Sequence, residues 1–148
     1  MKHFNVRVYG ILIVDDKLLV SDEFIKGVNV TKLPGGGLEF GEGTIDCVIR
    51  EFKEELDLDI EVISHFYTTD FFVHSAFNIN SQVISIYYKV KAVSPLNFKT
   101  STKLFDFPSR IEGGQSLRWI DYKSLSENDF TFVIDKLVAE MLSDSQLL

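Results

Sequence analysis

The first part of the chain has the pattern of apolar and polar residues that is typical of β-strands. Residues 6–14 are rich in β-branched and aromatic side chains, and they end at Asp15-Asp16, a pair that favours a turn. Residues 17–21 resume the apolar pattern, so the sequence predicts a hairpin. We predict a loop over residues 22–33 because the strand pattern is lost there.

The next apolar pattern has the spacing of an α-helix. Thr44 is expected to cap a helix that runs to about Leu56. Apolar residues recur every three or four positions along it and form one stripe that should face the core. This stripe consists of Ile45, Val48, Ile49, Phe52 and Leu56. A second helix is predicted over residues 129–143. Its buried side should carry Ile134, Leu137, Val138 and Met141.

Strands dominate the remaining segments. Residues 60–69 and 82–93 alternate as strands do, and residues 117–120 form a further short strand. Residues 94–116, which contain two prolines and several Ser and Thr residues, are predicted to be a long loop. Because two helices must cover a sheet, the pattern favours an α+β fold with a mixed sheet sandwiched between helices. A chain of this length is expected to form one domain over residues 1–148.

Composition and charge narrow the classes of partner. The formal net charge is −7, which disfavours non-specific binding to nucleic acid or to an anionic membrane. The only cysteine is Cys47, so an internal disulfide is excluded. No apolar run approaches the ~18 residues of a membrane span. We therefore expect a cytoplasmic protein with neither nucleic acid nor membrane as a partner.

Residues 36–58 carry the candidate chemistry. A glycine turn leads through an acidic loop into the first predicted helix, where Glu51, Glu54 and Glu55 fall within an arc of about 100°. Like charges at this spacing repel one another, so a counter-charge is expected. Arg50 supplies one, and a divalent cation would be a better one because hard oxygen ligands suit Mg²⁺ or Mn²⁺. A solvated acidic helix face is the alternative.

The spacing upstream of these carboxylates favours the functional interpretation. The segment resembles the Nudix box, G-x5-E-x7-R-E-U-x-E-E-x-G-U, in which U is a bulky aliphatic residue. It matches at Gly36, Glu42, Arg50, Glu51, Glu54, Glu55 and Leu58, with the aromatic Phe52 at a U position. The departure is Asp57 in place of the glycine that ends the helix, and Asp tolerates a left-handed conformation better than most residues. The resemblance to MutT-like Nudix hydrolases implies the Nudix fold over nearly the whole chain.

The resemblance also implies an activity and a cofactor. Nudix hydrolases cleave a nucleoside diphosphate linked to a moiety X, giving a nucleoside monophosphate and either phospho-X or pyrophosphate. The implied metal is Mg²⁺, with Mn²⁺ as a substitute. Its implied ligands are the Gly36 carbonyl, Glu51, Glu54 and Glu55. Arg50 would orient the carboxylates, and the general base would be a box glutamate such as Glu51 or Glu54, or a distant one.

The distant carboxylate and the substrate contacts leave alternatives open. Glu112 is the candidate for a distant base, and an exposed loop charge explains it equally well. Gly36 and Gly37 permit close approach of a ligand, and Lys32 could meet the substrate phosphates. Phe72 could stack on a base, although a homodimer interface or plain core would also account for it. A nucleotide-sensing domain that binds without cleaving, and a metal-dependent phosphatase, remain alternative functions.

Overall fold

The computed structural model describes residues 1–145, and the chain divides into two compact units. The first contains residues 1–12 and 34–98, and the second contains residues 13–33 and the chain from residue 99 on. Within residues 1–145, no helix is long and apolar enough to cross a membrane. A single domain over the whole sequence stays a prediction.

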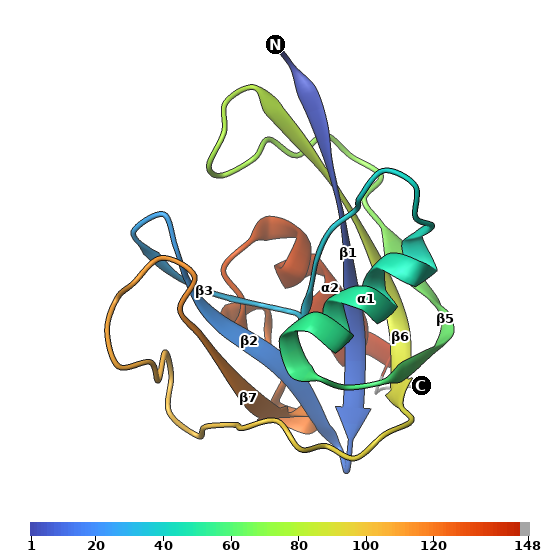
Figure 1. The fold of residues 1–148 in the computed structure, drawn as a ribbon, viewed down its shortest axis with the longest axis vertical. Coiled ribbons are helices and arrows are strands. Elements are labelled where there is room, and N and C mark those ends of the chain that lie inside the picture. Colours follow the sequence, from blue (N-terminus) through green and yellow to red (C-terminus); the bar gives the residue numbers. More distant parts are fainter. Residues whose placement is uncertain (146–148) are drawn as a thin grey trace. The chain divides into compact units, whose positions relative to one another are not determined.

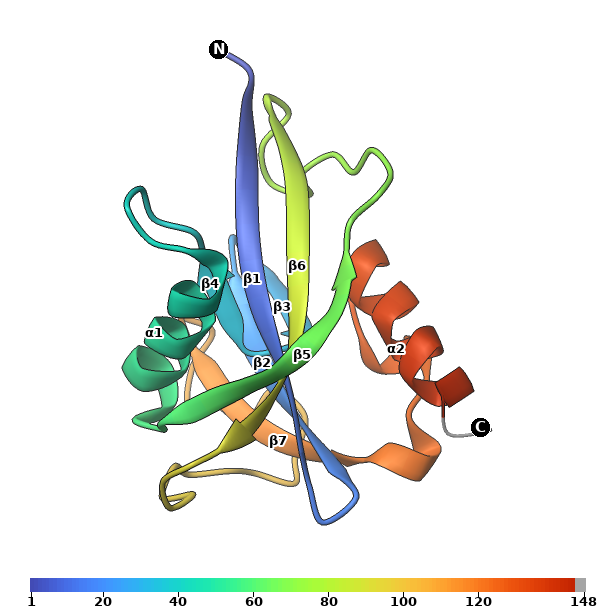
Figure 2. The same cartoon turned by 90° about the vertical axis from the view of Figure 1, so that its right-hand side faces the viewer.

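The first unit is built on a mixed sheet. Strand β1 (His3–Val14) runs parallel to β6 (Ser81–Ala92), and β6 pairs antiparallel with β5 (Ile60–Thr68). Figure 2 shows these three strands side by side. The short strand β4 (Gly35–Gly37) pairs antiparallel with β1, which sets Gly36 opposite Val8. The predicted strands at 60–69 and 82–93 are therefore confirmed.

Helix α1 (Thr44–Leu56) lies against β4 and β5 of the same unit. Phe52 is fully buried, and its ring occupies the space beside Gly10 where a Cβ atom would lie only 2.5 Å from the ring. A larger residue at position 10 would separate the helix from β1. The helix ends at Asp57, whose φ of 50° and ψ of 40° are left-handed. This confirms that Asp replaces the usual glycine in that conformation.

Two details of the predicted helix are wrong. The N-cap is Gly43, without a side-chain cap, whereas the Thr44 hydroxyl shares a 2.6 Å hydrogen bond with the hydroxyl of Tyr88. The buried stripe is also narrower than predicted, because Ile45 and Ile49 keep 46% and 36% of their surface exposed. Val48, Phe52 and Leu56 are buried as predicted, and Cys47 is buried in addition.

The second unit is built on three antiparallel strands. Strand β2 (Lys17–Ile25) lies between β3 (Val28–Lys32) and β7 (Gln115–Asp121), as Figure 1 shows. The predicted loop over residues 22–33 is wrong, because β2 and β3 form a hairpin there. Its two-residue turn is Lys26-Gly27, with φ angles of 47° and 82°. Positive φ at both positions matches the twist of the paired strands.

Helix α2 (Val133–Ser145) follows two short 3-10 helices, Tyr122–Ser124 and Glu127–Asp129, so it begins later than predicted. Its buried residues are Ile134, Asp135, Val138, Ala139 and Leu142. Leu137 and Met141 are only partly buried, which corrects two positions of the predicted face. The long loop before β7 is confirmed, although β7 begins two residues earlier than predicted.

A buried carboxylate anchors this loop within the second unit. Asp22 has no exposed surface, and its two oxygens accept hydrogen bonds from Arg118 Nε (2.9 Å) and Nη2 (3.0 Å). The Thr31 hydroxyl (2.7 Å) and the Phe105 backbone N–H (3.2 Å) complete the set. Phe105 has a positive φ of 51°. The carboxylate therefore joins β2, β3, β7 and the loop through fully paired polar groups.

Candidate active site

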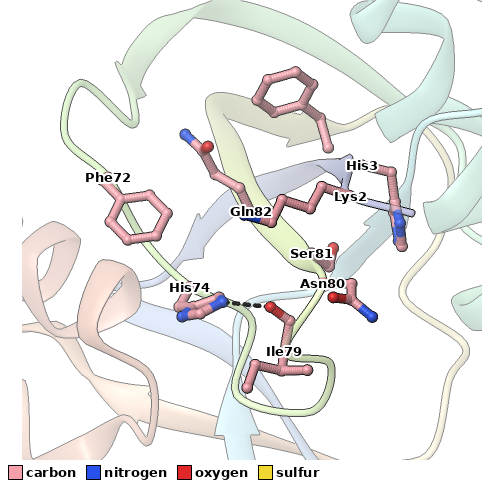
Figure 3. Close-up of a pocket in the computed structure, with 9 residues that line it drawn as sticks. Lys2, His3, Phe72, His74, Ile79, Asn80, Ser81 and Gln82 are labelled. Atoms are coloured by element: carbon pink, nitrogen blue, oxygen red, sulfur yellow. Dashed lines mark hydrogen bonds between the residues drawn. The ribbon is translucent and has the colours of Figure 1, made fainter.

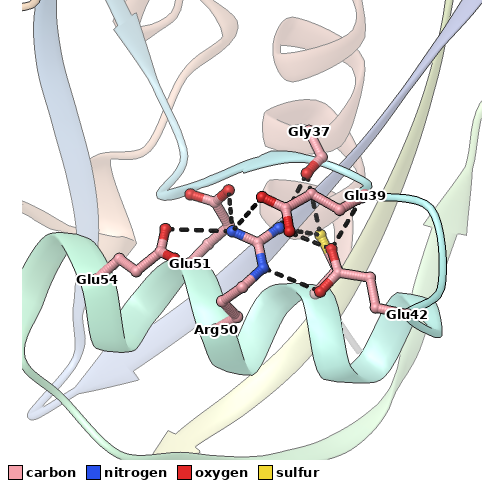
Figure 4. A network of polar contacts seen from close by, with 7 residues as sticks. Gly37, Glu39, Glu42, Arg50, Glu51 and Glu54 are labelled. Carbon is pink, nitrogen blue, oxygen red and sulfur yellow. Dashed lines mark hydrogen bonds and ion pairs between the residues drawn. The ribbon is translucent and has the colours of Figure 1, made fainter.

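Arg50 lies at the centre of the acidic cluster on α1 (Figure 4). One edge of its guanidinium faces Glu42 and forms a bidentate ion pair with its carboxylate. Nε donates to Oε2 at 2.9 Å and Nη2 donates to Oε1 at 2.7 Å. Nη2 also donates to the Gly37 carbonyl at 3.1 Å. This edge ties the middle of α1 to Gly37 and to Glu42 in the loop before the helix, and charge-assisted bonds of this kind are strong and directional.

The other edge of Arg50 faces the predicted metal ligands. Nη1 donates to Glu51 Oε1 at 2.9 Å and to Glu54 Oε2 at 3.2 Å, and it lies 3.7 Å from the Glu39 carboxylate. The Glu51 side chain is 13% exposed, whereas that of Glu54 is 59% exposed. Three carboxylates thus surround the NH2 group of Nη1, and those of Glu51 and Glu54 can move away without opening the pair with Glu42.

The backbone of Gly36 adjoins the Glu51 carboxylate. A Cβ atom built on Gly36 would lie 2.5 Å from both Cδ and Oε1 of Glu51. Only glycine therefore lets this carboxylate lie against β4. The arrangement brings a backbone segment and a hard carboxylate ligand together, which fits the predicted use of the Gly36 carbonyl and Glu51 by one cation.

The carboxylates do not yet converge on a common point. Within the described chain, no group of three or more His, Cys, Asp and Glu side chains is arranged to hold a metal ion. The physical reason is the guanidinium of Arg50, which occupies the space between Glu51 and Glu54. The donors suit Mg²⁺ or Mn²⁺ in kind. Metal binding would have to draw these two carboxylates away from Nη1.

The ion pair between Arg50 and Glu42 shifts the pKa of both side chains. The hydrogen bonds from Arg50, and then the one from the Glu39 backbone N–H, lower the pKa of Glu42 from 4.5 to about 2. The same pairing with Glu42 raises the pKa of Arg50 above its already high ordinary value. Both groups are therefore charged at neutral pH, and the ion pair is retained there.

The Glu42 pair makes stability depend on pH in acid. Between pH 4.5 and about 2, the folded Glu42 stays charged while the unfolded one takes up a proton, so acid favours unfolding. This contribution is complete above pH 4.5 and is lost as the pH falls through about 2. We expect the melting temperature of Glu42→Gln to fall less steeply than that of the wild type in thermal melts over this range. The exposed carboxylate of Glu61 provides the control Glu61→Gln, and equal slopes for all three proteins would contradict the assignment.

Cys47 lies beside this network as a packing residue. It has no exposed surface, and its Sγ lies 3.6 Å from the Gly37 carbonyl oxygen and 3.7 Å from Arg50 Nη2. Burial raises the pKa of the thiol to about 12. A nucleophile must be a thiolate at working pH, so the thiol has a structural role.

The contact between Gly36 and Glu51 leads to a prediction. Gly36→Ala should displace the Glu51 carboxylate, because the new methyl group and that carboxylate cannot occupy the same space. We expect Mn²⁺ binding to weaken by about 10–100-fold, the usual effect of losing a group that orients a ligand. Calorimetric titration with Mn²⁺ measures this directly. In Gly43→Ala the new Cβ would lie no closer than 3.4 Å to its neighbours, so this control should bind normally. Normal binding by Gly36→Ala would disprove the contact's importance.

Two further predicted site residues, Glu112 and Lys32, belong to the second unit. The Glu112 carboxylate accepts a 2.6 Å hydrogen bond from the Lys26 backbone N–H, at the turn between β2 and β3. Lys32 is 5% exposed and forms a 3.1 Å ion pair with Glu23. Both contacts lie within the second unit. The proposed roles of Glu112 as a base and of Lys32 as a phosphate ligand stay predictions.

Phe72 lies in the connection between β5 and β6 of the first unit. It is 66% exposed, and its ring centroid lies 5.5 Å from that of His74. It is therefore not a core residue, and its predicted contact with a base stays a prediction. The hydrogen bond between Thr44 and Tyr88 was not predicted, because two positions 44 residues apart carry no local signal.

Comparison with known proteins places nearly the whole chain in a family. The model of the NUDIX domain matches residues 3–141. A NUDIX hydrolase from Nitrosomonas europaea has a similar structure, with a TM-score of 0.70, 20% identity, and coverage of 97% of this chain and 90% of that one. A MutT NUDIX hydrolase from Burkholderia pseudomallei has a TM-score of 0.69 at 17% identity, covering 94% and 98%.

An ADP-ribose pyrophosphatase from Streptococcus suis 89-1591 is also similar, with a TM-score of 0.61 at 18% identity and coverage of 94% and 87%. At these identities the similarity to solved structures shows the fold. The predicted Nudix fold, of the α+β class with a mixed sheet, is confirmed.

Proposed function

Because the chain belongs to the Nudix family, and is therefore a pyrophosphohydrolase of the Nudix type, we propose the following reaction. The enzyme cleaves the pyrophosphate bond of a nucleoside diphosphate linked to X, with Mg²⁺ as its metal and Mn²⁺ as a substitute. The products are a nucleoside monophosphate and phospho-X, or pyrophosphate when X is phosphate. The observation that carries this proposal is the set of box carboxylates gathered around Arg50 beside the Gly36 backbone.

The proposed metal ligands are the Gly36 carbonyl and the carboxylates of Glu51, Glu54 and Glu55. When bound, the metal neutralises phosphate charge and lowers the pKa of the attacking water. Arg50 keeps its bonds to Glu42 and Gly37 and so holds the glycine loop against α1. Its other edge would release Glu51 and Glu54, which could then hold the metal. The general base is a box glutamate, with Glu112 as the distant alternative.

Candidate substrates are nucleoside triphosphates, ADP-ribose, nucleotide sugars and dinucleoside polyphosphates. The solved relative described as an ADP-ribose pyrophosphatase supports a search across these classes. A cytoplasmic location and a homodimer remain further predictions.

A substrate screen tests the proposal. One member of each substrate class is incubated with the protein and Mg²⁺, with and without a chelator. Both products are identified by mass spectrometry. Two phosphorylated products that form only with metal would support the reaction. Release of inorganic phosphate from monophosphates alone would instead indicate a phosphatase. Metal-dependent binding without turnover would indicate a nucleotide sensor.

A further inference from the structure

Acidic side chains are distributed unevenly over the first unit. Among the described residues that line the groove at the start of β1, where Lys2, His74 and Gln82 lie (Figure 3), there is no Asp or Glu. Around Arg50, by contrast, four glutamates pair with one guanidinium at nitrogen–oxygen distances from 2.7 to 3.7 Å. Three of them belong to the bidentate pair or to the proposed metal ligands. The fourth is Glu39, which belongs to neither.

Every N–H group of the Arg50 guanidinium has an oxygen acceptor. A guanidinium has five such groups, and two of them donate to Glu42, one to the Gly37 carbonyl, and one each to Glu51 and Glu54. When Glu51 and Glu54 turn to a cation, both hydrogen bonds of Nη1 are lost and the other three remain. The Arg50 side chain is only 22% exposed, so a charged donor left without a partner is costly there. A new acceptor for Nη1 would lower the cost of metal binding.

The loop before α1 holds the backbone of Glu39 beside this nitrogen. The Glu39 N–H donates to Glu42 Oε1 at 2.9 Å, and the Glu39 carbonyl accepts from the Glu42 N–H at 3.3 Å. The preceding residue, Leu38, is joined to β1, because its N–H donates to the Val6 carbonyl at 2.9 Å. Glu42 is itself held by Arg50, so none of these contacts depends on the proposed metal ligands. The Glu39 backbone therefore keeps its position when those ligands leave the guanidinium.

The Glu39 side chain lies just outside hydrogen-bond distance of the same nitrogen. Its carboxylate is 68% exposed, and its Oε1 lies 3.7 Å from Arg50 Nη1. An approach of about 1 Å, which side-chain rotation alone can cover, would give the roughly 2.7–2.9 Å of a charge-assisted hydrogen bond. In the structure Glu51 and Glu54 accept from both hydrogens of Nη1 and repel a third carboxylate. Their departure removes both obstacles.

We propose that Glu39 is a positioning residue, which replaces Glu51 and Glu54 on Arg50 Nη1 when these two carboxylates bind a divalent cation. The exchange keeps the guanidinium charge compensated and the guanidinium fixed against Glu42. It thereby lowers the free-energy cost of assembling the metal ligands. The inference rests on the proposed function for the identity of those ligands. Glu39 itself contacts Arg50 and not the cation, so the quantity that it changes is the affinity for the metal.

Calorimetric titration with Mn²⁺, without any substrate, tests the exchange. We expect Glu39→Gln to weaken Mn²⁺ binding about fivefold, the effect of one partly exposed ion pair that forms only in the metal-bound protein. Asp46→Asn is the control for charge alone. Asp46 is an exposed acidic residue in the first turn of α1, and in residues 1–145 it is not among the acidic partners of Arg50. This control should bind Mn²⁺ within about twofold of the wild type. A loss in Glu39→Gln no greater than in Asp46→Asn would overturn the proposal.

Added salt separates a direct contact from a general loss of negative charge. At about 1 M KCl the screening length falls to about 3 Å, so distant exposed charges hardly act on one another, whereas partly buried pairs are screened much less. Relative to the wild type at the same salt concentration, Glu39→Gln should keep most of its fivefold loss of Mn²⁺ affinity. Any effect of Asp46→Asn should disappear. If the effect of Glu39→Gln disappears as well, Glu39 acts only through the long-range field and the exchange is wrong.

A crystal structure of the wild type grown with Mn²⁺ gives an independent readout. We expect the Glu39 carboxylate within about 3.2 Å of Arg50 Nη1, with Glu51 and Glu54 on the cation. Glu39 bound to the cation itself, or Glu51 and Glu54 still bound to Nη1 beside an occupied metal site, would overturn the exchange.

Failure of the exchange and failure of the proposed function give different results. Mn²⁺ binding that depends on Glu39, in a protein that hydrolyses no substrate, would contradict the proposed reaction alone. Metal-dependent hydrolysis together with wild-type Mn²⁺ affinity in Glu39→Gln would contradict the exchange alone. A wild-type protein that binds no Mn²⁺ would contradict both.

Discussion

Glu54→Gln is expected to lower kcat by a factor on the order of 10²–10⁴, because a lost metal contact removes several kcal/mol of transition-state stabilisation. The amide cannot supply the charge that holds a divalent cation against a pyrophosphate. Glu54 is 59% exposed, and its 3.2 Å bond to Arg50 is the longest that Nη1 makes to the box carboxylates. The fold should therefore survive the change, and the loss should appear in the chemistry. Steady-state kinetics under saturating Mg²⁺ measure it.

Two companion variants make this result specific. Glu55→Gln should behave similarly and should also weaken Mg²⁺ binding. Glu61→Gln removes a carboxylate of the first unit that is about equally exposed, at 61%, and that forms an ion pair with Lys91. It should keep wild-type kcat. Wild-type activity in both Glu54→Gln and Glu55→Gln would contradict the proposed site.

Asp22→Asn is expected to lower the free energy of unfolding by about 3–5 kcal/mol, the usual cost of breaking a buried ion pair on one side. Asp22 has no exposed surface and the Arg118 side chain is only 13% exposed. The amide would leave the guanidinium charge uncompensated and would place N–H groups against it. The bond to the Phe105 backbone would weaken as well, which loosens the loop. Urea unfolding followed by circular dichroism measures the change.

A control and a second variant test the cause of this loss. Asp144 is exposed in the same unit, and Asp144→Asn should change stability by less than about 0.5 kcal/mol. Adding Arg118→Met to Asp22→Asn should restore part of the stability, because it removes the unpaired charge. If the double variant is less stable than Asp22→Asn, the ion pair is not the source of the loss.

The sequence predicted best those elements whose signals are local. The helix over residues 44–56 combines apolar residues at helical spacing with a residue at its end that tolerates a left-handed conformation, and Asp57 adopts it. The hairpin of β2 and β3 was missed because its turn is Lys26-Gly27. Lysine gives no turn signal of the kind that Asn or Asp gives, so the strand was predicted to end at residue 21.

The sequence predicted which residues make up the candidate site, but it did not predict how their side chains pair. The box spacing identified Glu42, Arg50, Glu51 and Glu54, but no pattern shows that Arg50 divides them between its two edges. That division depends on how the glycine loop folds back over α1. The ion pair of Asp22 with Arg118 joins positions 96 residues apart. A contact between residues so far apart in the sequence produces no periodic pattern from which it could be predicted.

The most direct test of the account is the Mg²⁺ dependence of hydrolysis, with both products identified by mass, for the best substrate from the screen. The wild type, Glu54→Gln and Glu61→Gln are compared at each Mg²⁺ concentration. The account predicts a monophosphate and its phosphorylated partner from the wild type and from Glu61→Gln, only when metal is present, and almost none from Glu54→Gln. Equal turnover by all three proteins, or turnover that persists in excess chelator, would contradict it.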